Sequence, residues 1–426
     1  MPYLLNRWGG SLCSMLLLLC VGSIWVASPA AADEFQERQW HLKAMDAKGL
    51  WSVSTGEGVT VAVIDSGVDP VPELRGRVSH ERNFAGDPPS GGGEGRSHGT
   101  EMASLIAGVG GSGGVQGLAP GSRIMSLQTG HGEATVGGSS EIWAQAIRYA
   151  ADHGARIINF SQTVRPFVPG PRDELNGPLR QLKSAVAYAR EKGLLVFAGS
   201  GNDGDTSNAP GYPSTFPGAI GVGAVDRSGK VAKFSTYGPQ VKLAAPGVDI
   251  PGRCKNGQGL CRQGGTSPAT ALASASAALI WSKHPTWTNN QVLRVMMQTA
   301  SKPEGKVPSK YIGYGIIRPG QVLIDGKGDP GDPDVNPLLP HEKSRESGKG
   351  QAESTRQPAT TPSGSPDGAA GADSEDARRA AEGVAARGRG DGDSSLLWPA
   401  LGVVAGAVTL GGAVLFARRR HPQSSV

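Results

Sequence analysis

Residues 59–69, VTVAVIDSGVD, carry a strong signal for a buried β-strand. The residues before Asp65 place apolar side chains on both faces of an extended chain, which is typical of strands inside a parallel sheet. The strand is expected to end at Asp65, before the turn SGVD. Because functional groups collect at the carboxyl ends of strands in open parallel sheets, Asp65 is a candidate functional residue.

Similar runs recur along the chain and alternate with amphipathic stretches of helical period. This alternation predicts an α/β fold, with a mostly parallel sheet and helices on both faces. Further strands are expected at 123–128, 156–161, 194–201 and 219–225. Helices are expected at 98–109, 140–154 and 177–193.

Composition and charge narrow the class of protein. The 64 Gly and 31 Pro among 426 residues indicate a turn-rich fold with a low-complexity region. The formal net charge is +5, but Arg7 and the cluster Arg418 to Arg420 contribute to it from the two ends. The middle of the chain has no basic patch interleaved with aromatic residues, so nucleic acid is not an expected partner.

An apolar segment lies near each end of the chain. Residues 1–32 have an Arg-bearing start, an apolar run and small residues before a cleavage point, as in a signal peptide. An uncleaved anchor would look similar. Residues 396–417 have the length of a transmembrane helix and precede a basic tail, 418–426. We therefore expect a single-pass protein of the cell membrane, with a cytoplasmic tail and an extracytoplasmic body.

The body is expected to span residues 33–323, including a short N-terminal extension. Residues 324–395 are dominated by Gly, Pro, Ser, Ala and charged residues, so we expect a disordered stalk there. In an oxidising exterior, Cys254 and Cys261 predict a local disulfide. A metal site at these cysteines would need further ligands that the neighbouring residues do not offer.

Three more residues stand where catalytic groups could act. His98 opens a helix of small residues, Ser267 follows a Gly pair before an Ala-rich helix, and Asn202 lies in a Gly-rich turn after a strand. Each residue could instead have a purely structural role, because helix caps and turns use the same residue types. The order Asp, His, Ser is nevertheless that of a subtilisin-type catalytic triad.

The segments around these residues resemble those of the subtilases and occur in subtilase order. This resemblance covers most of residues 40–323 and implies a subtilisin-like fold. The overall layout is similar to that of the mycosins, the membrane-anchored proteases associated with type VII secretion. The segments that carry the resemblance are VAVIDSGVD, SHGTEMASLIAG, YPSTFPGAIGVGAVD, LAAPGV, GGTSPATALAS and SKHPTWTNNQV.

The resemblance implies a role for each candidate residue. Ser267 would be the nucleophile, His98 the general base and later acid, and Asp65 the group that fixes the imidazole tautomer. The side chain of Asn202 and the N–H of Ser267 would hold the oxyanion. Ser161 matches the family segment that pairs with the substrate backbone.

The sequence also departs from the family pattern in three places. Ala271 stands where GTSxAxP has Pro, and Pro268 directly follows the nucleophile. The usual SLGG reads SQTV at 161–164, which leaves the shape of the specificity pocket open. The loop at 109–117 cannot supply the charge that a calcium site needs, so we expect no metal and no cofactor.

The sequence thus predicts a serine endopeptidase that hydrolyses exported protein or peptide substrates at the outer face of the cytoplasmic membrane. An association with a type VII secretion complex is expected from the mycosin resemblance. A second hypothesis is a scaffold that stabilises such a membrane complex while proteolysis is dispensable. A third is an esterase with the same acyl chemistry, which nothing in the sequence selects.

Overall fold

A computed structural model gives the structure of the protein. It describes residues 35, 37–86, 96–111, 114–130, 136–164, 177–254 and 259–339. The predicted signal peptide, transmembrane helix and tail lie outside these residues. Within the described part of the chain, no helix is both long and apolar enough to cross a membrane.

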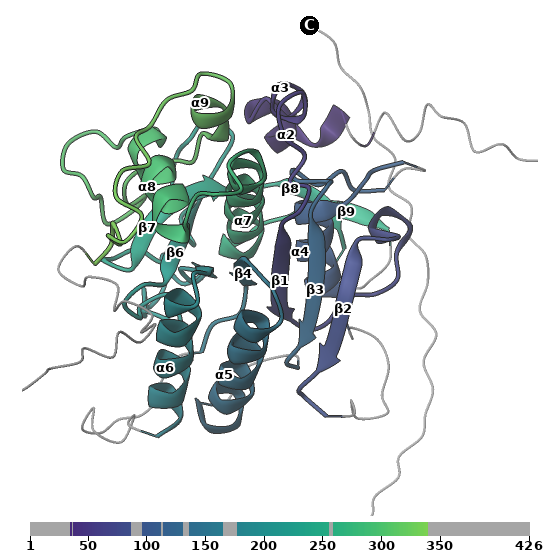
Figure 1. Ribbon diagram of the computed structural model, residues 1–426, viewed down its shortest axis with the longest axis vertical. Coiled ribbons are helices and arrows are strands. Elements are labelled where there is room, and N and C mark those ends of the chain that lie inside the picture. Colours follow the sequence, from purple (N-terminus) through teal and green to yellow (C-terminus); the bar gives the residue numbers. More distant parts are fainter. Residues whose placement is uncertain are drawn as a thin grey trace, which may run out of the picture. The chain divides into compact units, whose positions relative to one another are not determined.

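Seven parallel strands form the central sheet, in the spatial order β2-β3-β1-β4-β5-β6-β7 (Figure 1). Ile64, for example, pairs with Leu127 on one side and with Phe160 on the other. All five strands expected from the sequence are present, as β1 and β3 to β6. The strands are β1 (Thr60–Asp65), β2 (Val78–Asn83), β3 (Arg123–Gln128), β4 (Ile157–Phe160), β5 (Leu195–Gly199), β6 (Ile220–Val225) and β7 (Val241–Pro246).

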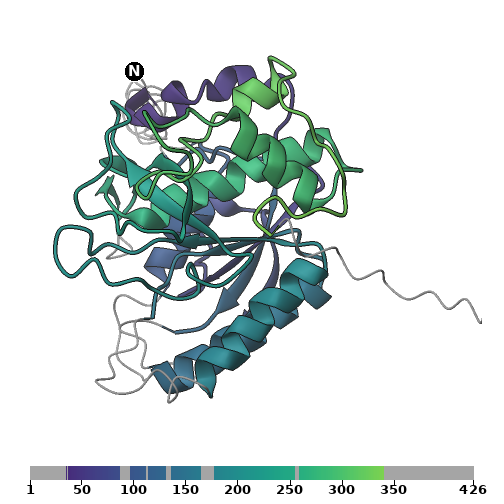
Figure 2. The same cartoon turned by 90° about the vertical axis from the view of Figure 1, so that its left-hand side faces the viewer.

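Helices cover both faces of this sheet, as predicted (Figure 2). One face is covered by α5 (Val136–Asp152) and α6 (Pro178–Glu191), which lie side by side. The other face is covered by α4 (Ser97–Ala107) and α7 (Thr266–Lys283), with α8 (Asn289–Thr299) packed on α7. Helix α7 is buried along most of its length, and its many Ala and Ser residues allow close packing.

Strand β1 shows why a continuous apolar run suits this position. Val61 and Val63 belong to the core beneath α4 and α7, whereas Ala62 and Ile64 belong to the core beneath α5 and α6. Each of these side chains is at most 1% exposed. Successive side chains of a strand point to opposite faces, so a strand covered on both sides needs apolar residues throughout.

The strand order reverses beside β1, because β3 lies on one side of it and β4 on the other. In open α/β sheets, such a reversal favours a site at the carboxyl ends of the strands. Asp65 closes β1 at this edge, and Ser161 directly follows β4. The topology therefore brings two of the predicted site residues to the same place.

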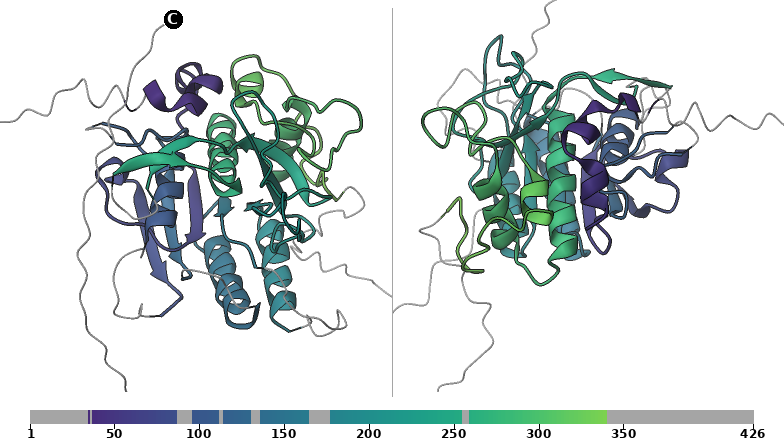
Figure 3. Two further views of the ribbon diagram at one scale, coloured as in Figure 1. Left: turned by 180° about the vertical axis from the view of Figure 1, so that it is seen from behind. Right: turned by 90° about the horizontal axis from the view of Figure 1, so that it is seen from above.

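A two-stranded antiparallel hairpin lies against α4 (Figure 3). It consists of β8 (Ile250–Arg253) and β9 (Leu260–Gln263). Arg253 donates two hydrogen bonds, of 2.6 and 2.7 Å, to the fully buried carboxylate of Glu73. This charged pair fixes the hairpin to the 3₁₀ turn η1 (Pro72–Leu74).

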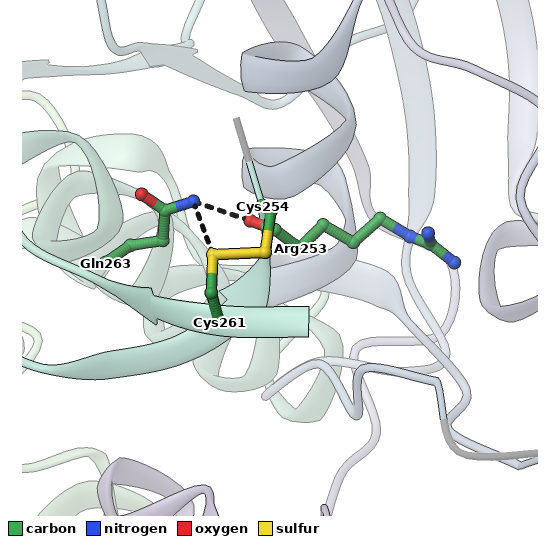
Figure 4. Close-up of a disulfide and its surroundings, with 4 residues drawn as sticks. All are labelled: Arg253, Cys254, Cys261 and Gln263. Atoms are coloured by element: carbon green, nitrogen blue, oxygen red, sulfur yellow. Dashed lines mark hydrogen bonds between the residues drawn. A yellow bond between two sulfur atoms is a disulfide. The ribbon is translucent and has the colours of Figure 1, made fainter. Parts of the chain in front are cut away.

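The hairpin also carries the two cysteines of the body. In the structure, Cys254 and Cys261 are joined in a disulfide, and their Cα atoms are 5.3 Å apart (Figure 4). The side-chain amide of Gln263 donates to the carbonyl oxygen of Arg253 at 2.7 Å, beside this disulfide. The pairing in the native protein stays a prediction.

The first part of the predicted stalk proves to be ordered. Residues 325–339 lie along α8, where the guanidinium of Arg294 donates to the backbone carbonyls of Pro330 and Val335. Polar side chains hold this segment by its backbone carbonyls, so the segment packs on α8 although it has few large apolar residues. The expected boundary after α9 (Pro319–Leu323) is therefore too early. The remaining stalk, 340–395, lies outside the described residues.

Candidate active site

The start of α4 packs directly on the turn that follows β1. The backbone N–H of Gly99 donates to Oγ of Ser66 at 2.9 Å. A Cβ on Gly99 would lie only 2.2 Å from the carbonyl oxygen of Gly67, so this approach requires glycine. The contact places His98, the second residue of α4, beside Asp65.

Asp65 and His98 form a hydrogen-bonded pair. Nδ1 of His98 lies 2.8 Å from Oδ1 of Asp65. The Asp65 side chain is 1% exposed, whereas that of His98 is 26% exposed. When Nδ1–H donates a hydrogen bond to the carboxylate, Nε2 is the ring nitrogen that can accept a proton. The pair therefore has the arrangement of a general base and its orienting group.

Ser267 is the second residue of α7. Its hydroxyl donates to the carbonyl oxygen of Ser161 at 3.1 Å, so the hydroxyl must rotate away from this carbonyl before it can donate to a base. Pro268 and Ala271, which depart from the family pattern, are both buried in a continuous helix. Proline is tolerated in the first turn of a helix because the N–H groups there have no partner within the helix.

Asn202 lies three residues after β5, and its side chain is exposed. Its Oδ1 accepts hydrogen bonds from the backbone N–H of Thr266 at 2.8 Å and from the Thr266 hydroxyl at 3.1 Å. With its oxygen held in this way, the amide can direct its N–H donors to another acceptor. The amide nitrogen lies 3.5 Å from the point where a Cβ on Gly265 would stand, beside the backbone that leads to Ser267.

Ser161 links the end of β4 to α7. Its Oγ donates to the carbonyl oxygen of Ser267 at 3.4 Å and accepts from Nδ2 of Asn159 at 3.1 Å. Oδ1 of Asn159 accepts in turn from the hydroxyl of Ser274, also in α7, at 3.2 Å. These contacts fix the nucleophile helix against the sheet. The predicted pairing of Ser161 with a substrate backbone stays a prediction.

All of the predicted catalytic and substrate-binding residues lie at one edge of the sheet. Two residues that hold them there were not predicted from the sequence. Ser66 supports the start of α4, and Thr266 supports Asn202. Each is a sequence neighbour of a predicted residue, Asp65 or Ser267, and that adjacency was the available signal.

Metal binding was not expected from the sequence. Among the described residues, the structure has no group of three or more His, Cys, Asp or Glu side chains that could hold a metal ion. Residues 112–113 of the glycine-rich loop lie outside the described part. The expectation therefore remains untested.

The parallel α/β fold and this arrangement of Asp, His, Ser and Asn define a subtilisin-like protein. The model of the subtilase family matches residues 56–315, which include all of the predicted site residues. The chain belongs to the subtilase family.

Individual subtilases and solved structures show which members of the family this chain is similar to. Subtilisin NAT from Bacillus subtilis subsp. natto is 36% identical over 270 residues, which are 62% of this chain and 65% of that protein. Among solved structures, MycP1 from Mycobacterium smegmatis has a TM-score of 0.60 and 27% identity, covering 70% of this chain and 87% of that one. The MycP3 protease from the type VII (ESX-3) secretion system has a TM-score of 0.56 and 30% identity, covering 67% and 87%. The predicted resemblance to subtilases and mycosins is confirmed.

Proposed function

We propose that this protein is a serine endopeptidase of the subtilisin type, with Asp65, His98 and Ser267 as its catalytic triad. The observation that carries the proposal is the 2.8 Å hydrogen bond between His98 and Asp65, at the edge of the sheet where Ser267 lies in the first turn of α7. A carboxylate in this position keeps the imidazole in the tautomer that can take a proton from serine. Membership of the subtilase family supports the same assignment.

Peptide hydrolysis at this site begins with a rotation of the Ser267 hydroxyl away from the carbonyl of Ser161. The hydroxyl gives its proton to Nε2 of His98 and attacks the carbonyl carbon of the scissile bond. The resulting oxyanion accepts hydrogen bonds from the amide of Asn202 and the N–H of Ser267, at the positive end of α7. His98 then protonates the leaving amine, and water repeats these steps to release the acid.

We also propose that the body acts on exported proteins or peptides at the outer face of the cytoplasmic membrane, in association with type VII secretion. The apolar segments 1–32 and 396–417 and the basic tail support this location. The similarity to MycP3, a protease from a type VII secretion system, supports the association. External protease should remove the body from intact cells and leave a short fragment with the tail. Protection of the body would overturn this topology.

A second candidate function is structural. The similarity to a secretion-system protease also fits a scaffold that stabilises a membrane complex while proteolysis is dispensable. Cells that carry Ser267→Ala separate the two functions when both processing and secretion of exported proteins are measured. Lost processing with intact secretion supports the endopeptidase. Unchanged processing in this variant, together with lost secretion in cells that lack the chain, supports the scaffold alone.

A further inference from the structure

The segment SQTV at 161–164 borders Ser267, and we propose that Thr163 restricts the substrate residue before the scissile bond to Gly, Ala or Ser. The inference rests on the proposed endopeptidase function and adds a side-chain specificity to it. It concerns a segment whose sequence departs from the SLGG of the family, so the specificity cannot be carried over from relatives.

The geometry of attack decides where the side chain of that substrate residue lies. The attacked carbon carries Oγ of Ser267, the oxyanion, the leaving amine and the Cα of the residue before the bond. The oxyanion lies toward Asn202, and the leaving amine lies toward His98, which must protonate it. The remaining direction leads between the segments that follow β4 and β5.

Two hydrogen bonds show that these segments flank the nucleophile. On the β4 side, the carbonyl of Ser161 accepts from the Ser267 hydroxyl at 3.1 Å. On the β5 side, the N–H of Gly201 donates to Oγ1 of Thr266 at 3.3 Å. Since β4 and β5 are paired neighbours in the sheet, a substrate side chain must fit between two closely spaced walls.

A third segment pairs with the residues that follow β4. Val164 and Tyr212 exchange two backbone hydrogen bonds, of 3.1 and 3.0 Å. Cγ2 of Thr163 lies 2.0 Å from the point where a Cβ on the buried Gly211 would stand, so the threonine methyl occupies the space over this glycine. Thr163 therefore lies between the backbone of the segment that follows β4 and Gly211. It is two residues from Ser161.

This position makes Thr163 a limit on side-chain size. A long substrate side chain that extends past Ser161 meets the branched side chain of Thr163. Thr163 cannot move away easily, because the adjacent Val164 is 1% exposed and both its N–H and its carbonyl are hydrogen-bonded to the backbone of Tyr212. A misfit of about one methylene changes discrimination between substrates by roughly 10–200-fold. Gly, Ala and Ser avoid it, whereas Leu and Phe do not.

The test uses the full-length protein and peptide substrates that differ only in having Ala or Phe before the scissile bond. Thr163→Gly should lower the Ala-to-Phe ratio of kcat/KM by about 10–200-fold, because it removes the branched side chain. Thr163→Val is the matched control, since it keeps the shape and should retain the preference for Ala. A fluorophosphonate without a peptide side chain reports whether Ser267 still reacts in each variant.

The two proposals fail in different ways. If Thr163→Gly reacts with the fluorophosphonate but shows the wild-type ratio, the specificity inference is overturned and the endopeptidase stands. If the wild-type protein cleaves the Phe peptide as well as the Ala peptide, the inference is overturned in the same way. If folded wild-type protein neither reacts with the probe nor cleaves any peptide, the endopeptidase function fails and the inference fails with it.

Discussion

Oδ1 of Asn202 accepts a hydrogen bond from the backbone N–H of Thr266 at 2.8 Å. A carboxamide has one oxygen and one nitrogen, so holding the oxygen also sets the direction of the N–H donors. Thr266 directly precedes Ser267, and the bond therefore ties the proposed oxyanion donor to the proposed nucleophile. The catalytic contribution of Asn202 can be separated from this structural contact by the choice of substitution.

Asn202→Asp keeps an acceptor for Thr266 but removes the N–H donors, whereas Asn202→Ala removes both. We expect each variant to lose about 10²–10³ in kcat for peptide hydrolysis, because one transition-state donor is missing. Thermal unfolding should show that Asn202→Asp remains folded. A wild-type kcat in Asn202→Asp would show that this amide does not stabilise the oxyanion.

Gly99→Ala should disturb the approach of α4 to the turn after β1. The new Cβ would lie 2.2 Å from the carbonyl oxygen of Gly67, and relief of this clash must move His98 relative to Asp65. We expect a loss of about 1–3 kcal/mol in stability, as in other overpacked sites. The rate of labelling by a fluorophosphonate should fall as well.

The control for this variant is Gly320→Ala in α9. A Cβ there would make only ordinary contacts, 3.7 Å from Cδ1 of Ile324 and 4.0 Å from Cδ2 of Leu50, so this change should leave stability and labelling near wild type. Thermal unfolding and labelling rates are measured for both variants. Equal behaviour of the two would contradict a special role for the Gly99 contact.

Acid should destabilise the protein through His41 of α2 (Trp40–Ala44). This side chain is fully buried, and neither ring nitrogen has a hydrogen-bond partner among the described residues. Burial lowers the pKa of His41 from 6.5 to about 3. Between these values the unfolded chain binds the proton and the folded protein does not, so stability falls as the pH falls from 6.5 toward 3.

The contribution of His41 can be at most about 1.4 kcal/mol per pH unit, the value for one proton. Urea unfolding at pH 7 and pH 4.5 measures it in the wild type and in His41→Leu, which cannot take up a proton there. We expect the wild type to lose more stability than the variant between the two pH values. Equal losses would show that His41 is not the acid-sensitive group.

The disulfide of the β8–β9 hairpin should be present in protein exported by its natural host. Mass spectrometry of non-reduced peptides should find Cys254 linked to Cys261. The loop is short, so replacing both cysteines by serine should cost only about 2 kcal/mol of unfolding free energy. Two free thiols in the exported protein would reject the pairing.

The strands covered on both faces could be predicted from the sequence, because burial on both sides leaves a continuous apolar run. Strand β2 could not, since five of its six residues are exposed and it is held by backbone pairing with β3. Helix α8 was missed although a capping box joins Thr288 to Gln291 at its start.

The site was predictable residue by residue but not contact by contact. Asp65, His98 and Ser267 each stand at a strand end or helix start that the sequence marks clearly. The hydrogen bond from Ser267 to Ser161 joins residues 106 positions apart, and it depends on how α7 packs on β4. The contact of Thr163 with Gly211 likewise depends on two loops that meet only in the folded protein.

The most direct test of the proposed triad is covalent labelling of the full-length protein by a fluorophosphonate probe, with the modified residue identified by mass spectrometry. Ser267 should be labelled in the wild type, and labelling should be lost in His98→Ala, because a neutral serine hydroxyl is a poor nucleophile without an adjacent base. Normal labelling of Ser267 in His98→Ala, or no labelling of the folded wild type, would contradict the triad.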